Sequence, residues 1–217
     1  MVQFLDIAIV FLSFSVLVIF KRTKSYLSVG GLLLILSVLG LFVLKYLTIG
    51  NLSEIGFRTD NLSATIIPTS IYLALSVAIL FTMRFKPKKF KAFKWIFALI
   101  SLYLIFGLLQ QFFFQAIFTH TINKLVDEKI LVILFSAVFF SSFHWGWDSK
   151  GIKFGLMTIF GGVVMSTLFL INPNIYILGI AHGILASFYY FIVYEGNILE
   201  KRIHPNVKRS ILGIIHH

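Results

Sequence analysis

Cysteine is absent from the 217 residues, and charged side chains are scarce at 12% of the sequence. Without a thiol the chain can form no disulfide and use no cysteine nucleophile, which excludes cysteine-dependent membrane transpeptidase chemistry. A soluble domain carries roughly 25% charged residues. The low charge, together with 59% hydrophobic residues and a mean hydropathy of +0.95, therefore excludes a water-soluble fold and predicts a membrane protein.

Long apolar runs separated by short polar segments make up most of the chain. A helix needs about 20 apolar residues to cross the roughly 30 Å hydrocarbon core. In the last run, Gly179 and Gly183 form a small-xxx-small pair that predicts close approach of a neighbouring helix. We predict an all-α polytopic bundle of about seven transmembrane helices, forming a single domain over residues 1–217. The predicted spans are Val2–Phe20, Tyr26–Leu44, Ala64–Met83, Trp95–Phe118, Ile130–Trp147, Phe154–Ile171 and Ile175–Tyr194.

Basic residues cluster between the apolar runs, so the net charge of +11 indicates topology rather than nucleic-acid binding. If the N-terminus is outside, the inner segments hold all but four of the 19 basic residues, which places the C-terminus in the cytoplasm. The basic run over residues 84–94 suits either a stop-transfer anchor or contact with anionic membrane lipids. We expect no nucleic-acid partner. The four basic residues on the outer side are Lys45, Arg58, Lys124 and Lys129.

Five polar side chains in the predicted spans are the main functional candidates: Gln110, Gln111, Gln115, His144 and His182. Polar groups in lipid are costly and normally face the bundle interior. The glutamines suit either hydrogen bonds between helices or a shared site, and each histidine alone suits packing. None of the eight acidic residues is expected within a span. Two histidines without a carboxylate or thiolate make a poor zinc set, so we expect no metal and no cofactor.

The order and spacing of these residues resemble the motifs of a protease family. Leu109–Ala116, LQQFFFQA, resembles the E-E-x-x-x-R motif of the CAAX-protease and bacteriocin-processing (CPBP) intramembrane proteases. Gln110 and Gln111 stand at the glutamate positions, and Gln115 stands at the arginine position. About thirty residues later, Phe140–His144 matches the family's F-x-x-x-H motif in full.

The resemblance extends over about residues 55–195. His182–Ala186 resembles the H-x-x-x-N motif, with Ala186 in place of the asparagine. Ile55–Arg58 resembles a short segment that often precedes the family's core, and Asn174–Ala181 resembles the approach to its last histidine. The resemblance therefore implies a CPBP-like intramembrane core.

In that family a motif glutamate is thought to activate water, while the histidines and asparagine complete the site and stabilise the oxyanion. Carried over, Gln110 and Gln111 cannot act as general bases, because an amide has no titratable proton near neutral pH. Gln115 lacks the charge of the arginine. Because both glutamates are also replaced by neutral residues, no unpaired charge remains in the site. We therefore predict a catalytically impaired pseudoprotease that binds a partner membrane protein or peptide as a scaffold, regulator or immunity-type factor.

Two alternatives remain at this stage. An active but divergent CAAX-type endopeptidase would use His144 and His182, with Asp148 orienting His144 as a base for water. A small transporter or lipid-handling protein would carry the motif matches by accident. The predicted site is lined by Gln115, Phe140, Asp148 and Ala186. Short loops and compactness favour a multi-pass protein of the cell membrane, in a bacterial inner membrane.

The relative depth of the motifs conflicts with a shared site. At 1.5 Å per residue, Gln110 and His182 are predicted roughly 4–5 Å to the outer side of their span midpoints. His144 is predicted roughly 7 Å to the inner side. Counted from the span midpoints, the motifs do not meet at one depth, although helix tilt averaging about 20° and long side chains would close part of the gap. We nevertheless predict that Gln110 or Gln111, His144 and His182 converge on one cavity between the fourth, fifth and seventh helices, because isolated polar groups in lipid would otherwise lack partners.

Overall fold

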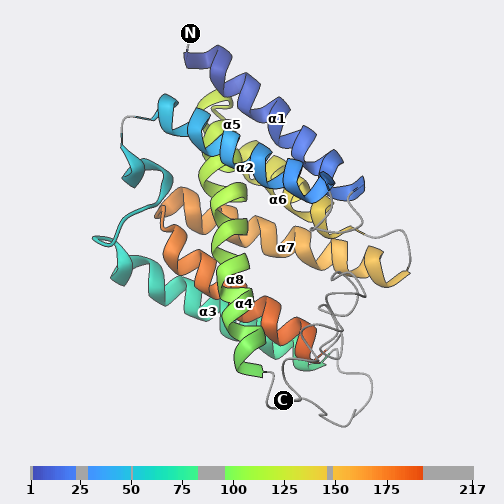
Figure 1. Cartoon of the computed structure of the whole chain (residues 1–217). Coiled ribbons are helices and arrows are strands. Elements are labelled where there is room, and N and C mark those ends of the chain that lie inside the picture. Colours follow the sequence, from blue (N-terminus) through green and yellow to red (C-terminus); the bar gives the residue numbers. More distant parts are fainter. Residues whose placement is uncertain (1, 23–28, 50, 83–95, 146–148, 193–217) are drawn as a thin grey trace, which may run out of the picture.

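The computed structural model describes residues 2–22, 29–49, 51–82, 96–145 and 149–192, and within these ranges the chain is helical with no β-strand (Figure 1). This confirms the predicted all-α fold. A short 3₁₀-helix, η1 (Leu52–Ile55), precedes the third long helix, and a π-helix, η3 (Phe112–Thr119), continues the fourth. The α-helices are α1 (Val2–Arg22), α2 (Val29–Thr48), α3 (Leu62–Thr82), α4 (Ile96–Gln111), α5 (His120–Leu125), α6 (Lys129–His144), α7 (Ser149–Ile171) and α8 (Ile175–Ile192).

Four helical segments are long and apolar enough to cross a membrane by length and composition: Gln3–Arg22, Leu62–Thr82, Ile100–Leu125 and Ile152–Ile171. Three further apolar stretches of helix are shorter: Leu36–Thr48, Lys129–His144 and Ile175–Tyr189. These seven segments correspond to the seven predicted spans. The fourth differs most, because the helix continues through η3 and α5 to Leu125, whereas its end was predicted at Phe118.

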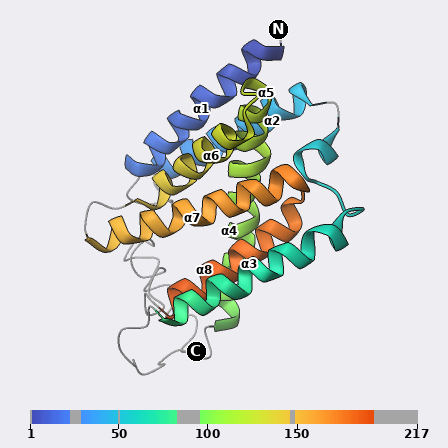
Figure 2. The ribbon, with the colours of Figure 1, turned by 180° about the vertical axis from the view of Figure 1, so that it is seen from behind.

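The helix formed by α4, η3 and α5 runs through the middle of the bundle (Figure 1). Helices α1, α2 and α6 surround its α5 end, and α3 and α8 lie nearer the other end, as the view from behind also shows (Figure 2). Helix α4 packs on α8 at glycines. A Cβ atom on Gly107 would lie 2.4 Å from the carbonyl oxygen of Gly179, and one on Gly183 would lie 2.6 Å from that of Tyr103. The backbones are therefore in direct contact, as the small-xxx-small spacing predicted.

Two charged residues lie inside the bundle, contrary to prediction. Asp6 of α1 is 2% exposed and Lys45 of α2 is fully buried, with 3.7 Å between the lysine Nζ and the Asp6 Oδ1. The Lys45 ammonium also donates a hydrogen bond of 2.6 Å to the hydroxyl of Thr121 in α5. Lys45 was predicted to follow the second span, whereas it lies within the apolar helix Leu36–Thr48. The expectation of no acidic residue within a span was wrong, since Asp6 lies inside the predicted span Val2–Phe20. The charges are tolerated in the bundle because they pair with each other.

Candidate functional site

The glutamines lie where the central helix changes from α to π geometry. Helix α4 ends at Gln111, and Gln115 lies within η3. The hydroxyl of Thr119 donates to the carbonyl of Phe114, five residues earlier, at 2.9 Å. Gln111 and Gln115 are 0% and 1% exposed, so both amides are enclosed by protein. π-Helices are rare and frequently occur at functional sites, which directs attention to this segment.

Gln111 joins the first motif to the last histidine. Its Nε2 lies 2.6 Å from Nδ1 of His182. With the amide donating, Nδ1 accepts and the neutral ring carries its proton on Nε2. The ring centroid of His144 lies 6.5 Å from that of His182. Phe140 contacts both imidazoles, with centroid distances of 4.6 Å to His144 and 5.5 Å to His182.

The structure thus brings Gln111, Phe140, His144 and His182 together between α4, α6 and α8. The difference in depth counted from the span midpoints does not keep these side chains apart. Figure 1 shows that α4 crosses α6 and α8 steeply. Positions counted along helices that are not parallel do not give comparable depths, so the comparison of span midpoints failed.

Gln115 and Gln110 have different surroundings from Gln111. The Nε2 of Gln115 donates to the hydroxyl of Ser166 on α7 at 3.4 Å, and that serine is fully buried. Gln110 is half-buried, whereas Gln111 and Gln115 are fully enclosed. Among the described residues, the side-chain oxygens of all three glutamines are shielded and lack a hydrogen-bond partner. Sequence reasoning missed Ser166, because a serine in an apolar helix is an ordinary packing residue.

The His144 ring is oriented by a hydrogen bond within its own helix. Its Nδ1 lies 3.0 Å from the carbonyl oxygen of Phe140, so Nδ1–H donates and Nε2 carries the lone pair. Asp148, predicted to orient this ring, lies outside the described residues. Ala186 follows His182 by one helical turn and offers only a methyl group. The described residues contain no group of three or more His, Asp or Glu side chains able to hold a metal ion.

The position of His182 depends on an asparagine at the start of α8. The Asn174 carboxamide oxygen accepts the backbone N–H three residues later at 3.0 Å, which makes it an N-cap. Its Nδ2 donates to the carbonyl of Arg58 at 3.0 Å and to the side chain of Asn61 at 2.7 Å. The carbonyl of Gly56 accepts the first N–H of α8 at 2.9 Å. The two flanking segments of the resemblance therefore meet, two turns before His182.

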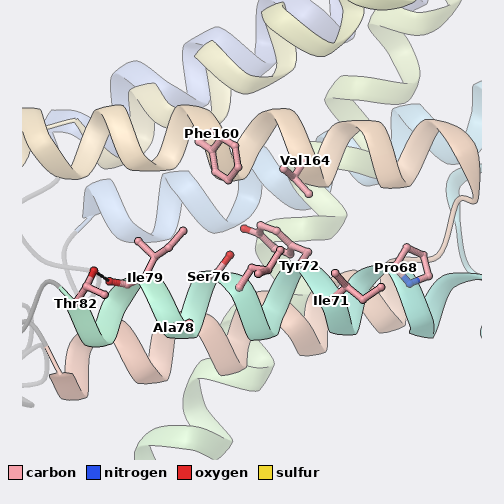
Figure 3. A pocket seen from close by; sticks show the side chains of 10 residues that line it. Pro68, Ile71, Tyr72, Ser76, Ala78, Ile79, Thr82, Phe160 and Val164 are labelled. Atoms are coloured by element: carbon pink, nitrogen blue, oxygen red, sulfur yellow. Dashed lines mark hydrogen bonds between the residues drawn. The ribbon is translucent and has the colours of Figure 1, made fainter.

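Two grooves lie along α3 rather than at the motif residues. One lies between α3 and α7, with a volume of about 500 Å³, and Tyr72, Ser76 and Phe160 are among its lining side chains (Figure 3). The other lies between α3 and α8, with a volume of about 510 Å³. Both linings are predominantly apolar, so these grooves suit hydrocarbon chains rather than a polar ligand.

Comparison with known proteins identifies one related family. Residues 92–188 match the family model described as type II CAAX prenyl endopeptidase, Rce1-like. The matched segment contains all three motifs and leaves out α1, α2 and α3. No curated protein and no solved structure matches the chain. The family resemblance predicted from the motifs is thereby confirmed for this segment.

Proposed function

Because residues 92–188 make this chain a homologue of the Rce1-like CAAX prenyl endopeptidases, we propose that it is a pseudoprotease of that intramembrane family. The chain keeps the shape and hydrogen bonding of the family site without hydrolysing peptides. It binds a partner membrane protein or peptide there, as a scaffold, regulator or immunity-type factor.

The contact between Gln111 and His182 carries this proposal. Hydrolysis requires a group that takes a proton from water, and a carboxamide cannot do so. The amide instead makes a neutral hydrogen bond to the imidazole. Gln115 is likewise neutral and bonded to Ser166, so the buried groups need no counter-charge. A neutral, hydrogen-bonded cluster supports retention of the site for its shape.

The test of catalysis is direct. The purified protein is incubated with prenylated-peptide and leader-peptide substrates in detergent micelles. We expect no cleavage above background, because loss of a general base removes about 10²–10⁴-fold in rate. Cleavage that disappears in His144→Ala would refute the pseudoprotease.

The test of binding uses affinity purification in mild detergent followed by mass spectrometry. We expect a stoichiometric membrane partner whose recovery falls in Gln111→Leu. The matched control is Leu109→Ala, two residues earlier, where the side chain is 54% exposed on the outside of the bundle. Equal loss of the partner in both variants would contradict binding at the motif site.

An active divergent peptidase is the second candidate, and the tautomer of His144 favours it. With Nδ1–H donating to Phe140, the Nε2 lone pair is the basic atom. An enzyme of this kind would need both imidazoles for activity, because no carboxylate stands at the position of the motif base. A peptidase activity that is present in the parent protein and absent in both His144→Ala and His182→Ala would favour this candidate over the first.

We further propose that the N-terminus is outside and the C-terminus cytoplasmic, in the cell membrane of a bacterium. The distribution of basic residues supports this orientation. The basic run at 84–94, which lies outside the described residues, would then contact anionic lipids of the inner leaflet. Reporter fusions after Lys94 and at the C-terminus test the orientation. A fusion after Lys94 that is active only as a periplasmic reporter would overturn it.

A further inference from the structure

The π-helix η3 is contacted near both ends by side chains of α2. At its first residue, the ring of Phe112 packs against Phe42, with 5.1 Å between centroids. Two residues past its end, the hydroxyl of Thr121 accepts the hydrogen bond from Lys45 at 2.6 Å. Phe42 and Lys45 are three apart in α2 and therefore lie on one face of that helix. A single face of α2 thus contacts the central helix at both ends of the π segment, at Phe112 and just beyond it at Thr121.

Helix α1 completes this contact. Its Phe14 packs edge-on against Phe118 of η3 at 5.9 Å, and against Phe139 of α6 at 5.1 Å. Phe118 is in turn stacked on Phe139, at 3.8 Å and 13°. Asp6 pairs with Lys45 and so connects α1 to the contact at Thr121. Both helices lie outside the segment that matches the family model.

A π-helix of eight residues needs such support, because most π-helical segments are single-turn bulges inside α-helices. Its register decides where Gln115 points. Each residue of an α-helix turns by about 100°, so a change of register by one residue would rotate Gln115 by a comparable angle relative to Gln111. Gln115 would then leave Ser166 while Gln111 kept its contact with His182. The π geometry is therefore a condition for the contact of Gln115 with Ser166 to exist together with that of Gln111 with His182.

We infer that the α1–α2 pair is a brace that fixes the π-helical register of η3, with Phe42 and Lys45 as positioning residues for the glutamine site. Phe42 and Lys45 act through the two ends of η3. Helix α1 also contacts the F-x-x-x-H motif, where Phe20 packs against Phe143 at 5.2 Å. Its role is the same whether the site hydrolyses peptides or only binds them.

The experiment measures register by crosslinking, since the chain has no native cysteine. Cysteines at positions 115 and 166 are bridged by a short bifunctional thiol reagent, in the full-length protein in lipid nanodiscs. A second pair at 141 and 158 reports the α6–α7 contact, where the two hydroxyl oxygens are 3.2 Å apart. The brace is weakened in two ways, by Lys45→Met combined with Asp6→Asn, which leaves no unpaired charge, and by Phe42→Ala. The matched control is Gly40→Ala in the same helix, where a Cβ meets no described atom within 4 Å.

We expect the 115–166 yield to fall about fivefold in both weakened proteins, the population change that corresponds to roughly 1 kcal/mol. The 141–158 yield should stay at the parent level, and Gly40→Ala should change neither pair. A merely structural role would lower both yields together, and that result would overturn the inference. An unchanged 115–166 yield would also overturn it. A fall in one weakened protein alone would remove the positioning role from the residue whose variant did not respond.

Discussion

Substitution of Gly107 by alanine should separate α4 from α8 and break the contact between the motifs. The added Cβ would lie 2.4 Å from the Gly179 oxygen and 2.6 Å from the Gly183 nitrogen, where ordinary contacts begin at 3.4 Å. The helices must therefore move apart by about 1 Å, because packed interiors hold few voids that could absorb the atom. Gln111 lies one turn after Gly107, and His182 precedes Gly183. Their hydrogen bond of 2.6 Å would lengthen to about 3.6 Å, which no longer counts as a bond.

The expected loss of stability is about 2–4 kcal/mol, the sum of overpacking at about 1–3 kcal/mol and one lost hydrogen bond at about 1 kcal/mol. Thermal unfolding in detergent measures the first effect, and recovery of the membrane partner measures the second. Gly40→Ala is the matched control, since it adds a methyl group in open space and gains up to about 1 kcal/mol of helix propensity. Unchanged stability and unchanged partner recovery in Gly107→Ala would refute the reasoning.

Three further outcomes are expected. Lys45→Met leaves Asp6 unpaired in the bundle and should cost about 3–5 kcal/mol, most of which adding Asp6→Asn should restore; a double-mutant cycle of unfolding free energies that shows simple additivity would contradict this. Asn174→Ala removes the N-cap of α8 and its bonds to the preceding loop, which should cost about 2–3 kcal/mol in the same assay, whereas a loss within experimental error would dismiss the cap. Hydrogen bonds from Arg58 hold the pKa of Asp60 below its usual value, so this pair contributes stability above the ordinary carboxyl pKa near 3.9 and loses that contribution as pH falls through the lowered value. Asp60→Asn should flatten this part of the acid unfolding profile, and an unaltered profile would count against it.

Hydropathy predicted the helices well, because the cost of burying a backbone polar group in lipid leaves few alternatives to a continuous helix. It did not predict the π-helix, since the sequence FFFQAIFT has no feature that distinguishes it from the α-helical segment before it. That geometry depends on rings from α1, α2 and α6, which no local pattern contains. The fourth span was predicted to end at Phe118, but the helix continues to Leu125 for a related reason. Helix α5 continues the apolar run with polar residues such as Thr121 that are satisfied by distant partners.

The motifs identified the candidate site residues but did not predict which of them would be in contact. Gln111 rather than Gln110 contacts His182, a choice that the pair of adjacent glutamines left open. The link between Asn174 and Asn61 joins positions 113 residues apart, and sequence reasoning saw only two separate flanks. An asparagine before an apolar run does signal an N-cap, so the cap itself was accessible from sequence. The bond from Asn174 to Asn61 could not be predicted from sequence, because it depends on how the tertiary fold brings the start of α8 next to the start of α3.

The buried pair of Asp6 and Lys45 bears on how the chain enters the membrane during synthesis. A charge at the centre of an inserting helix costs about 2.5–3.5 kcal/mol, and a buried charge nearer a helix end, such as Asp6 early in α1 or Lys45 in the last turn of α2, costs part of that. Each of the first two helices carries one such charge, and the two are of opposite sign. The third partner, Thr121, follows Lys45 by 76 residues and is made only later. Helices α1 and α2 should therefore leave the translocation channel together as a hairpin, with the ion pair already formed before the family core is complete.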